Sequence, residues 1–402
     1  MIAQTVAHSM ATDALYLDDQ DRYSRLRLIS WWDQERLRGA RLMVVGAGAL
    51  GNEVLKNLAL LGVGRIYVLD LDCVENSNLS RSVLFRVTDE GKPKAQAAAR
   101  ALSELNPDVA VEARRANVIT DVGLGVFREM DVVVGCLDNR EARLWVNRSC
   151  WKAGVTWIDG AIQEIAGVMK VFSPPDGSCY ECTMTEADYR LINLRYSCPL
   201  LRHEDLVQGK VPTAPTISSI VAGLQTQEAL KLLHGFRDFA GKGLVVSGMG
   251  NNFYTTAFPR KESCLSHETY PAIESLELSS EESRAEDLFT ASRELFGETR
   301  GALKLTLDRD LLVKVECPPC GISREVMRPL AKVSHQEAIC PGCGEVMSTD
   351  IASEVLEGSP LAQRQLAGLG IPAYDVVRVS RADESRFVCL AADRARALGA
   401  VA

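Results

Sequence analysis

The chain has 402 residues, a net charge of −8 and 47% hydrophobic residues. This length predicts two or more domains, and the acidic balance argues against bulk binding of nucleic acid, which needs a basic surface. No stretch approaches ~18 uninterrupted apolar residues and the N-terminus is rich in aspartate, so the sequence predicts no membrane span and no secretory signal. Six of the 12 cysteines form three C-x-x-C pairs, which favours metal ligation in a reducing cytoplasm over disulfides.

A helical segment (1–40) and then a glycine-rich turn are predicted at the start of the chain. Leu42–Val45 is a short apolar run, typical of a strand buried in a parallel sheet, and Leu50–Leu61 has helical spacing. Gly46 and Gly48 between them permit a tight turn, and Gly51 lets the helix pack closely on the strand. The unpaired N–H groups at the start of this helix are suited to bind phosphate.

A second predicted strand, Arg65–Leu69, ends in Asp70, nineteen residues after Gly51. An acidic side chain at this place can hold a ribose hydroxyl. Taken alone, these residues fit a nicotinamide-dependent oxidoreductase as well as other nucleotide-binding proteins.

The residues that follow Asp70 favour a triphosphate over a dinucleotide. Asn78, Arg81 and Lys94 come after the second strand. The three phosphates of ATP bring about four negative charges, which positioned Arg, Lys and magnesium stabilise. An isolated Arg or Lys is usually a solvated surface charge, so the prediction depends on the joint occurrence of these residues.

A third predicted strand, Asp131–Gly135, is followed by Asp138 and Asn139. Because ligands bind at the carboxyl ends of parallel strands, Asp138 is the expected magnesium ligand and Asn139 is expected to fix the nucleotide. The alternative is an ordinary Asp-Asn turn.

Together these residues resemble the ubiquitin-activating and molybdopterin/thiamine-biosynthesis adenylyltransferase superfamily, from Arg22 to about His267. Ala49 and Ser82 depart from its pattern, where many members have glycine and glutamine. The matching motifs are Arg22-Tyr23-Ser24-Arg25, Gly46-Ala47-Gly48-Ala49-Leu50-Gly51, Leu69-Asp70-Leu71-Asp72, Asn78-Leu79-Ser80-Arg81, Gly91-Lys92-Pro93-Lys94, Leu137-Asp138-Asn139 and Gln225-x-x-Glu228-Ala229-Leu230-Lys231.

The resemblance implies a Rossmann-like, mainly parallel α/β adenylation domain that binds ATP and Mg²⁺. The implied reaction is adenylation of the C-terminal carboxylate of a ubiquitin-like protein, which gives an acyl adenylate and pyrophosphate. Arg25 is implied to reach from one subunit of a homodimer into the nucleotide site of the other. The resemblance places Asp70 on the ribose, Asn78, Arg81 and Lys94 on the phosphates, and Asp138 on magnesium. The full implied nucleotide-binding set is Gly46, Gly48, Ala49, Gly51, Asp70, Asp72, Asn78, Arg81, Lys94, Asp138 and Asn139.

Cys179 and Cys182 form a C-x-x-C pair after a Ser-Pro-Pro-Asp-Gly turn, as in half of a tetrahedral zinc site. Many members of the superfamily supply the other half after a late helix, and the matching residues here are Cys264 and His267. The resemblance therefore implies a Cys₃His zinc site, with an ordinary loop role for His267 as the alternative.

Four further cysteines have the spacing of a zinc ribbon, C-x₂-C-x₁₉-C-x₂-C: Cys317, Cys320, Cys340 and Cys343. A glycine after each pair favours the tight turns that aim the thiolates at one metal. Pairing of Cys179 and Cys182 with one half of this ribbon stays open.

Cys198 lies sixteen residues after Cys182 and has no C-x-x-C partner. Ubiquitin-activating enzymes of the eukaryotic type have a similar cysteine after such a zinc pair, and it takes the carboxylate as a thioester. Arg195, Arg202 and His203 are candidates for lowering its pKa. The alternative is a buried structural cysteine. The next residue, Pro199, departs from the superfamily, which commonly has threonine there.

The predicted organisation is a helical segment (1–40), an adenylation domain (41–268), an acidic connector (269–300) and a zinc-ribbon α+β domain (301–402). An amphipathic helix is expected over Ser280–Phe296. The last domain is expected either to dock a ubiquitin-like substrate or a conjugating enzyme, or to be a structural appendage. Its predicted strands are Ala302–Leu307, Leu311–Glu316, Tyr374–Val379 and Arg386–Ala391.

The first hypothesis is a cytoplasmic, homodimeric enzyme that adenylates a ubiquitin-like protein, takes it onto Cys198 and passes it to a conjugating enzyme. The second is a sulfur-carrier adenylyltransferase that stops at the acyl adenylate. The third is a redox enzyme, and the fourth is a non-enzymatic zinc-ribbon adaptor with a degenerate nucleotide fold.

Overall fold

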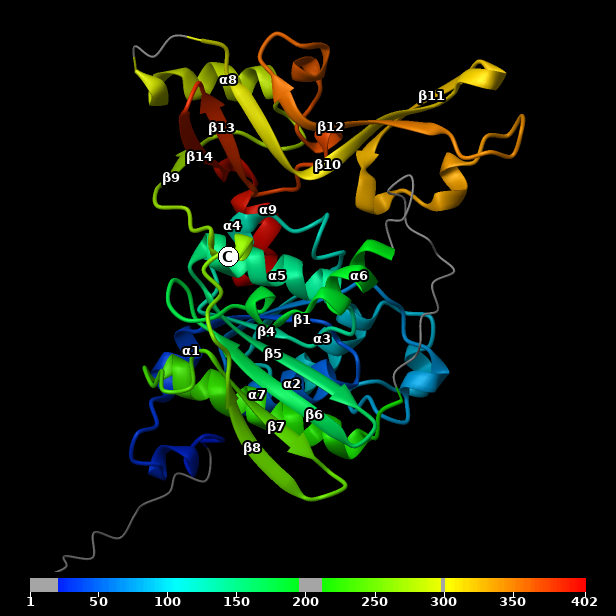
Figure 1. Cartoon of the computed structure of the whole chain (residues 1–402). Helices are drawn as coiled ribbons and strands as arrows, with labels where there is room; N and C mark the ends of the chain where they lie inside the picture. The colour runs from blue at the N-terminus through cyan, green and yellow to red at the C-terminus, as the bar shows by residue number, and fades with distance from the viewer. Residues whose placement is uncertain (1–20, 195–211, 298–300) are drawn as a thin grey trace, which may run out of the picture.

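The computed structural model describes residues 21–194, 212–297 and 301–402. Two β-sheets lie one above the other, and the short helices α4 (Leu124–Arg128) and α9 (Arg394–Leu398) lie between them with α5 (Arg140–Ala153) (Figure 1). Within these ranges, no helix is long and apolar enough to cross a membrane.

The first sheet has eight strands in the order β3-β2-β1-β4-β5-β6-β7-β8. The five strands from β3 to β5 run parallel to one another, and β6 to β8 continue the sheet as antiparallel strands. The predicted mainly parallel fold is therefore confirmed. The strands are β1 (Arg41–Val45), β2 (Arg65–Asp70), β3 (Ala110–Arg115), β4 (Val132–Gly135), β5 (Thr156–Gln163), β6 (Ala166–Phe172), β7 (Lys242–Ser247) and β8 (Asn252–Ala257).

Helices cover both faces of this sheet, as expected for a doubly wound fold. On one face α2 (Ala49–Leu60), α3 (Lys94–Leu105) and α7 (Pro215–Leu233) bury a core with the apolar residues of β1, β2 and β4. On the other face α4, α5 and α9 bury a second core. The helices α1 (Gln34–Gly39) and α6 (Glu186–Leu194) lie at the periphery (Figure 1).

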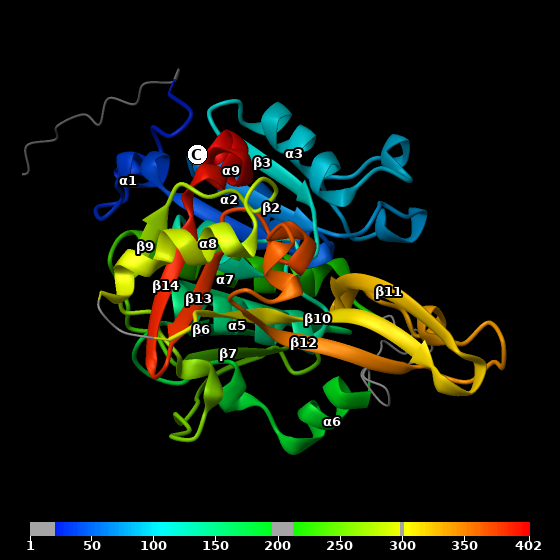
Figure 2. The same cartoon turned by 90° about the horizontal axis from the view of Figure 1, so that it is seen from above.

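The second sheet belongs to the C-terminal part of the chain and packs against α8 (Ala285–Ser292). Its order is β11-β10-β13-β14-β9, with β12 also paired to β10. In both views β10, β11 and β12 form an arm that projects away from the rest of the sheet (Figures 1 and 2). The strands are β9 (Ile273–Leu276), β10 (Lys304–Cys317), β11 (Ile322–Pro329), β12 (Ser348–Leu356), β13 (Val376–Arg381) and β14 (Glu384–Leu390).

Two predicted elements of this part differ from the observed ones. The expected strands Ala302–Leu307 and Leu311–Glu316 are one strand, β10, whose register shifts between Thr306 and Leu311. The expected helix Ser280–Phe296 begins only at Ala285, and it continues after Ser292 as a 3₁₀ helix over Arg293–Phe296. The residues before Ala285 bond elsewhere, since the N–H of Ser280 donates to Asp393.

The end of the chain returns to the first sheet. The hydroxyl of Tyr67 on β2 donates to the carbonyl of Ala397, and the N–H of Ala400 donates to Glu112 on β3. Leu398 and Val401 are fully buried in the core that α4 and α5 share. The last residues therefore cover β2 and β3 on the face where these strands have no helix of their own.

Candidate active site

The glycine-rich turn between β1 and α2 has the geometry that its sequence predicts. Gly46 has a φ of +100°, and a Cβ there would lie 2.4 Å from the carbonyl oxygen of Cys136. A Cβ on Gly51 would lie 1.9 Å from the carbonyl oxygen of Gly46, whereas one on Gly48 meets nothing within 4 Å. Packing thus requires glycine at positions 46 and 51, whereas the side of the turn at Gly48 is open.

Asp70 at the end of β2 holds this turn. Its carboxylate accepts from the N–H of Ala47 at 2.7 Å and from the N–H of Asp72 at 2.8 Å. Burial raises the pKa of the Asp70 carboxyl, and Lys94 and the two amides oppose that shift. The contact with Ala47 was not predicted, and the ribose contact stays a prediction.

Lys94 links the acidic residues of the site. Its ammonium donates to Asp72 at 2.9 Å, and its side chain is 12% exposed. Burial alone would lower the pKa of Lys94, but the charges of Asp70, Asp72 and Asp138 outweigh it and raise the pKa above its usual value. The acidic neighbours of Lys94 thus favour its charged form.

Asp138 and Asn139 follow β4 at its carboxyl end, as predicted. Asp138 is exposed, and its carboxylate accepts from the amide of Asn139 at 3.5 Å. The Asn139 side chain also accepts from the N–H of Ala142 at 2.8 Å, so it caps α5. An exposed carboxylate fits a Mg²⁺ ion, which prefers oxygen ligands and retained waters.

Asn78 and Arg81 lie on the segment between β2 and α3. The amide oxygen of Asn78 accepts from the N–H of Glu75, and Arg81 donates to the carbonyl of Ser77 at 2.8 Å. Arg25 is exposed at the start of a short 3₁₀ helix, Leu26–Leu28.

Asn52 is a functional candidate that the sequence analysis missed. It is fully buried on α2, where its amide donates to the carbonyls of Ala47 and Gly48 and its oxygen accepts from the N–H of Leu84 at 2.9 Å. It ties the glycine turn to the segment that carries Arg81. No separate signal marked it in the sequence, because Glu53, Lys56 and Asn57 are also polar residues of this helix.

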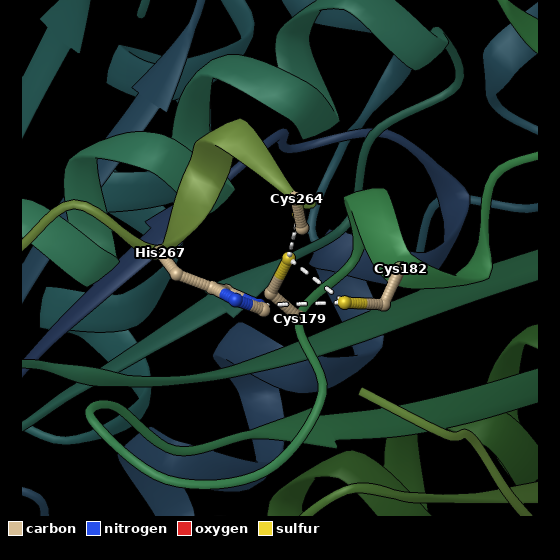
Figure 3. A group of neighbouring side chains, drawn as sticks. All are labelled: Cys179, Cys182, Cys264 and His267. Carbon is tan, nitrogen blue, oxygen red and sulfur yellow. Dashed lines mark hydrogen bonds between the residues drawn. The ribbon is translucent and has the colours of Figure 1, made fainter. Parts of the chain in front are cut away.

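Cys179, Cys182, Cys264 and His267 form the first cysteine cluster (Figure 3). The Sγ atoms of Cys179 and Cys264 are 3.5 Å apart, and Sγ of Cys182 lies 3.3 Å from Nε2 of His267. Around a tetrahedral zinc, ligands about 2.3 Å from the metal are about 3.8 Å apart. The four donors fit that ion, and the ring of Trp151, 4.4 Å from that of His267, orients the histidine.

The four ribbon cysteines form a second, separate cluster, whose sulfur atoms all lie within 4.8 Å of one another. Cys179 and Cys182 therefore do not pair with half of the ribbon. Gly321 and Gly344 have φ values of +66° and +75°, as the predicted tight turns require. Thiolate donors in this arrangement also fit zinc.

Cys198, with Arg195, Arg202 and His203, lies outside the described residues, so the predicted thioester site stays a prediction.

Residues 21–266 match the ThiF family. The chain belongs to the ThiF family. This match confirms the superfamily resemblance seen in the sequence.

Among curated proteins, this ThiF-family chain is 33% identical over 262 residues to the sulfur carrier protein adenylyltransferase of Thermus thermophilus, covering 61% of the chain and 90% of the relative. It is 33% identical to the SAMP-activating enzyme E1 of Haloferax volcanii, covering 64% and 90%. It is 30% identical to ubiquitin-like modifier-activating enzyme 5 of Dictyostelium discoideum, covering 60% of the chain but less than two thirds, 65%, of that relative.

Among solved structures, the chain resembles E. coli MccB in complex with ATP. The TM-score is 0.52 and the identity 25%, over 62% of this chain and 74% of MccB.

Proposed function

We propose that this ThiF-family protein adenylates the C-terminal carboxylate of a ubiquitin-like or sulfur-carrier protein. The observation that supports this most is the arrangement at one edge of the sheet, where Asp70 holds the glycine turn, Lys94 donates to Asp72, and Lys94 lies within electrostatic reach of Asp70 and Asp138. The names of the Thermus, Haloferax and Dictyostelium relatives support the same class of substrate.

In the proposed reaction, a carboxylate oxygen of the substrate attacks the α-phosphorus of ATP, and the bond to pyrophosphate breaks. The N–H groups at the start of α2 hold phosphate oxygens. Lys94 and Arg81 neutralise the charge that develops on the phosphates. Asp138 holds Mg²⁺, which supplies further charge neutralisation. Arg25 of a second copy of the chain completes the site in a homodimer.

Two continuations of the reaction are proposed as alternatives. In the first, the Cys198 thiolate attacks the acyl carbon, AMP leaves, and the thioester passes to a conjugating enzyme. The Haloferax and Dictyostelium relatives, named as activating enzymes, favour this course. In the second, the reaction stops at the acyl adenylate, as the name of the Thermus relative favours.

The proposal also includes the domain organisation and the cytoplasmic location of the protein. An adenylation domain over residues 41–268 works in the cytoplasm with zinc in both cysteine clusters. The zinc-ribbon domain, residues 301–402, docks either the substrate or the conjugating enzyme.

The test is ATP–pyrophosphate exchange with a co-purifying small protein that ends in glycine. Lys94→Met should reduce the exchange by about 100-fold or more, the usual loss for one charge-stabilising donor, whereas Lys92→Met, at an exposed neighbour, should leave it unchanged. A thiol-sensitive adduct that is absent in Cys198→Ser would select the first continuation, and exchange without an adduct the second. Binding of a nicotinamide cofactor without pyrophosphate exchange would instead support a redox enzyme. A chain that shows neither exchange nor nicotinamide binding would support a non-enzymatic adaptor.

A further inference from the structure

The end of β4, which leads to Asp138, is held from both faces of the sheet by two side chains. The helices α7 and α5 lie on opposite faces of the sheet (Figure 1). Gln225 belongs to α7 and Arg143 to α5. The mechanism proposed above assigns no role to either residue.

Gln225 is fully buried and spans two neighbouring strands. Its amide donates to the carbonyl of Gly135 on β4 at 2.9 Å and to the carbonyl of Ile158 on β5 at 3.3 Å. A Cβ on Gly160 would lie 2.5 Å from the Gln225 amide. The side chain thus fits a space that only glycine at position 160 leaves free, which fixes its place.

Arg143 holds the next part of the segment. Its guanidinium donates to the carbonyl of Leu137, the residue before Asp138, and to the carbonyl of Gly160 at 3.1 Å. Its Nε donates to Asp159 on β5 at 3.0 Å, and the two side chains are 13% and 2% exposed. A buried ion pair adds little net stability, because desolvation of both charges offsets their attraction. Stability alone therefore does not explain this pair.

Backbone pairing shows why this segment needs side-chain partners. The pairing of β4 with β5 ends at Gly135 and Asp159. Beyond it, the N–H of Cys136 donates to Val45 of β1, so the segment keeps a backbone partner on that side. The carbonyls of Gly135 and Leu137 accept from Gln225 and Arg143.

We propose that Arg143 and Gln225 are positioning residues that fix the carboxylate of Asp138 where it binds Mg²⁺. This inference rests on the proposed function. The hydrogen bonds that hold the glycine turn and Lys94 come from Asp70, Asn52 and Asp72, not from Arg143 or Gln225. Loss of Arg143 or Gln225 should therefore weaken the Mg²⁺-dependent part of nucleotide binding and spare the rest.

The experiment is calorimetric titration of the full, zinc-loaded chain with ATP, with and without MgCl₂. Arg143→Lys and Gln225→Met should each reduce the gain in affinity due to Mg²⁺ by about tenfold, the effect of one lost hydrogen bond, with metal-free ATP affinity within about twofold. Thr226→Val, at a buried neighbour on α7 that bonds within its own helix, is the matched control. The double variant should lose less than the product of the single losses, because both residues hold one segment.

The inference is overturned if either variant loses metal-free and Mg²⁺-dependent affinity equally, or if neither changes the Mg²⁺ gain. Should Arg143→Lys fail to fold, as judged by its thermal transition and zinc content, Gln225→Met alone decides. A wild-type chain that binds no ATP would contradict the proposed function itself, whereas normal wild-type binding with unchanged variants contradicts only the inference.

Discussion

Single residues of the site were predictable where one residue type is required by backbone geometry. Gly46 and Gly51 are such cases, since a Cβ at either would collide with backbone atoms. Partners were not predictable: Asp70 bonds the turn, and Asn52 and Gln225 act through contacts with residues far away in the sequence, Leu84 and Gly135. A sequence gives the chemical type of a side chain, and only the fold decides which backbone groups lie within its reach.

Asp89 shows the same point for the segment that carries Arg81. Its fully buried carboxylate accepts two bonds from Arg100 on α3, at 2.6 and 2.7 Å, and one from the N–H of Arg86. Arg100 above all, together with that amide, holds the pKa of Asp89 far below its usual value. The ionised group thus stabilises the folded state above the unfolded pKa of about 3.9.

Asp89→Asn should therefore lower the free energy of unfolding at pH 7 by about 1–3 kcal/mol. The difference from wild type should shrink by about 1.4 kcal/mol for each pH unit below ~4, because the folded wild type then resists protonation that the unfolded chain accepts. Urea unfolding of both proteins at pH 7 and near pH 3 measures this. A difference that stays constant across that range would show that the Asp89 charge is not the cause.

At the scale of elements, long apolar runs were predicted well and exposed strands were not. The buried strands β1, β2 and β4 lie within a residue of their predicted bounds. In contrast, β12 alternates weakly and is mostly accessible, and its position follows from pairing with β10. The two cysteine clusters were predictable because zinc ligation imposes local spacing, although the joining of Cys179 with Cys264 depends on the fold.

Two zinc ions per chain are expected, one in each cluster. Cys320→Ser should remove one zinc and leave ATP affinity unchanged, because the ribbon has a small core of its own within the β10–β12 arm. Cys264→Ser should remove the other zinc and lower the thermal stability of the adenylation domain, since its cluster packs on Trp151 of α5. Elemental analysis with thermal unfolding measures both, and one zinc per wild-type chain would contradict the two-site arrangement.

For the whole molecule, the relation between the two sheets could not be predicted from local patterns. The core on the α5 face contains residues of the first part and also Tyr374, Val376 and Leu398 of the C-terminal part. Glu129 on the first part accepts from Tyr374 and Arg394 of the last. Such contacts join residues more than 200 positions apart, and no periodicity in the sequence encodes them.

Arg309 on β10 is a buried polar link between the two parts. It is 9% exposed, pairs with Asp375 at 2.7 Å and donates to the carbonyls of Ile119 and Val122 in the first part. Asp375 in turn accepts from the N–H of Leu124 at 2.7 Å. Removal of Arg309 would leave a buried carboxylate without its cation, a change that costs about 3–5 kcal/mol.

Arg309→Met should therefore separate the unfolding of the two parts into two calorimetric transitions, where the wild type shows one. The matched control is Arg364→Met, whose ion pair with Glu325 is exposed and is worth no more than about 1 kcal/mol. The substitution acts at the contact between the two parts, so the C-terminal part, which holds the second sheet, should unfold first. ATP should still raise the temperature of the second transition, which belongs to the adenylation domain. Equal, single transitions in both variants would show instead that apolar contacts alone hold the two parts together.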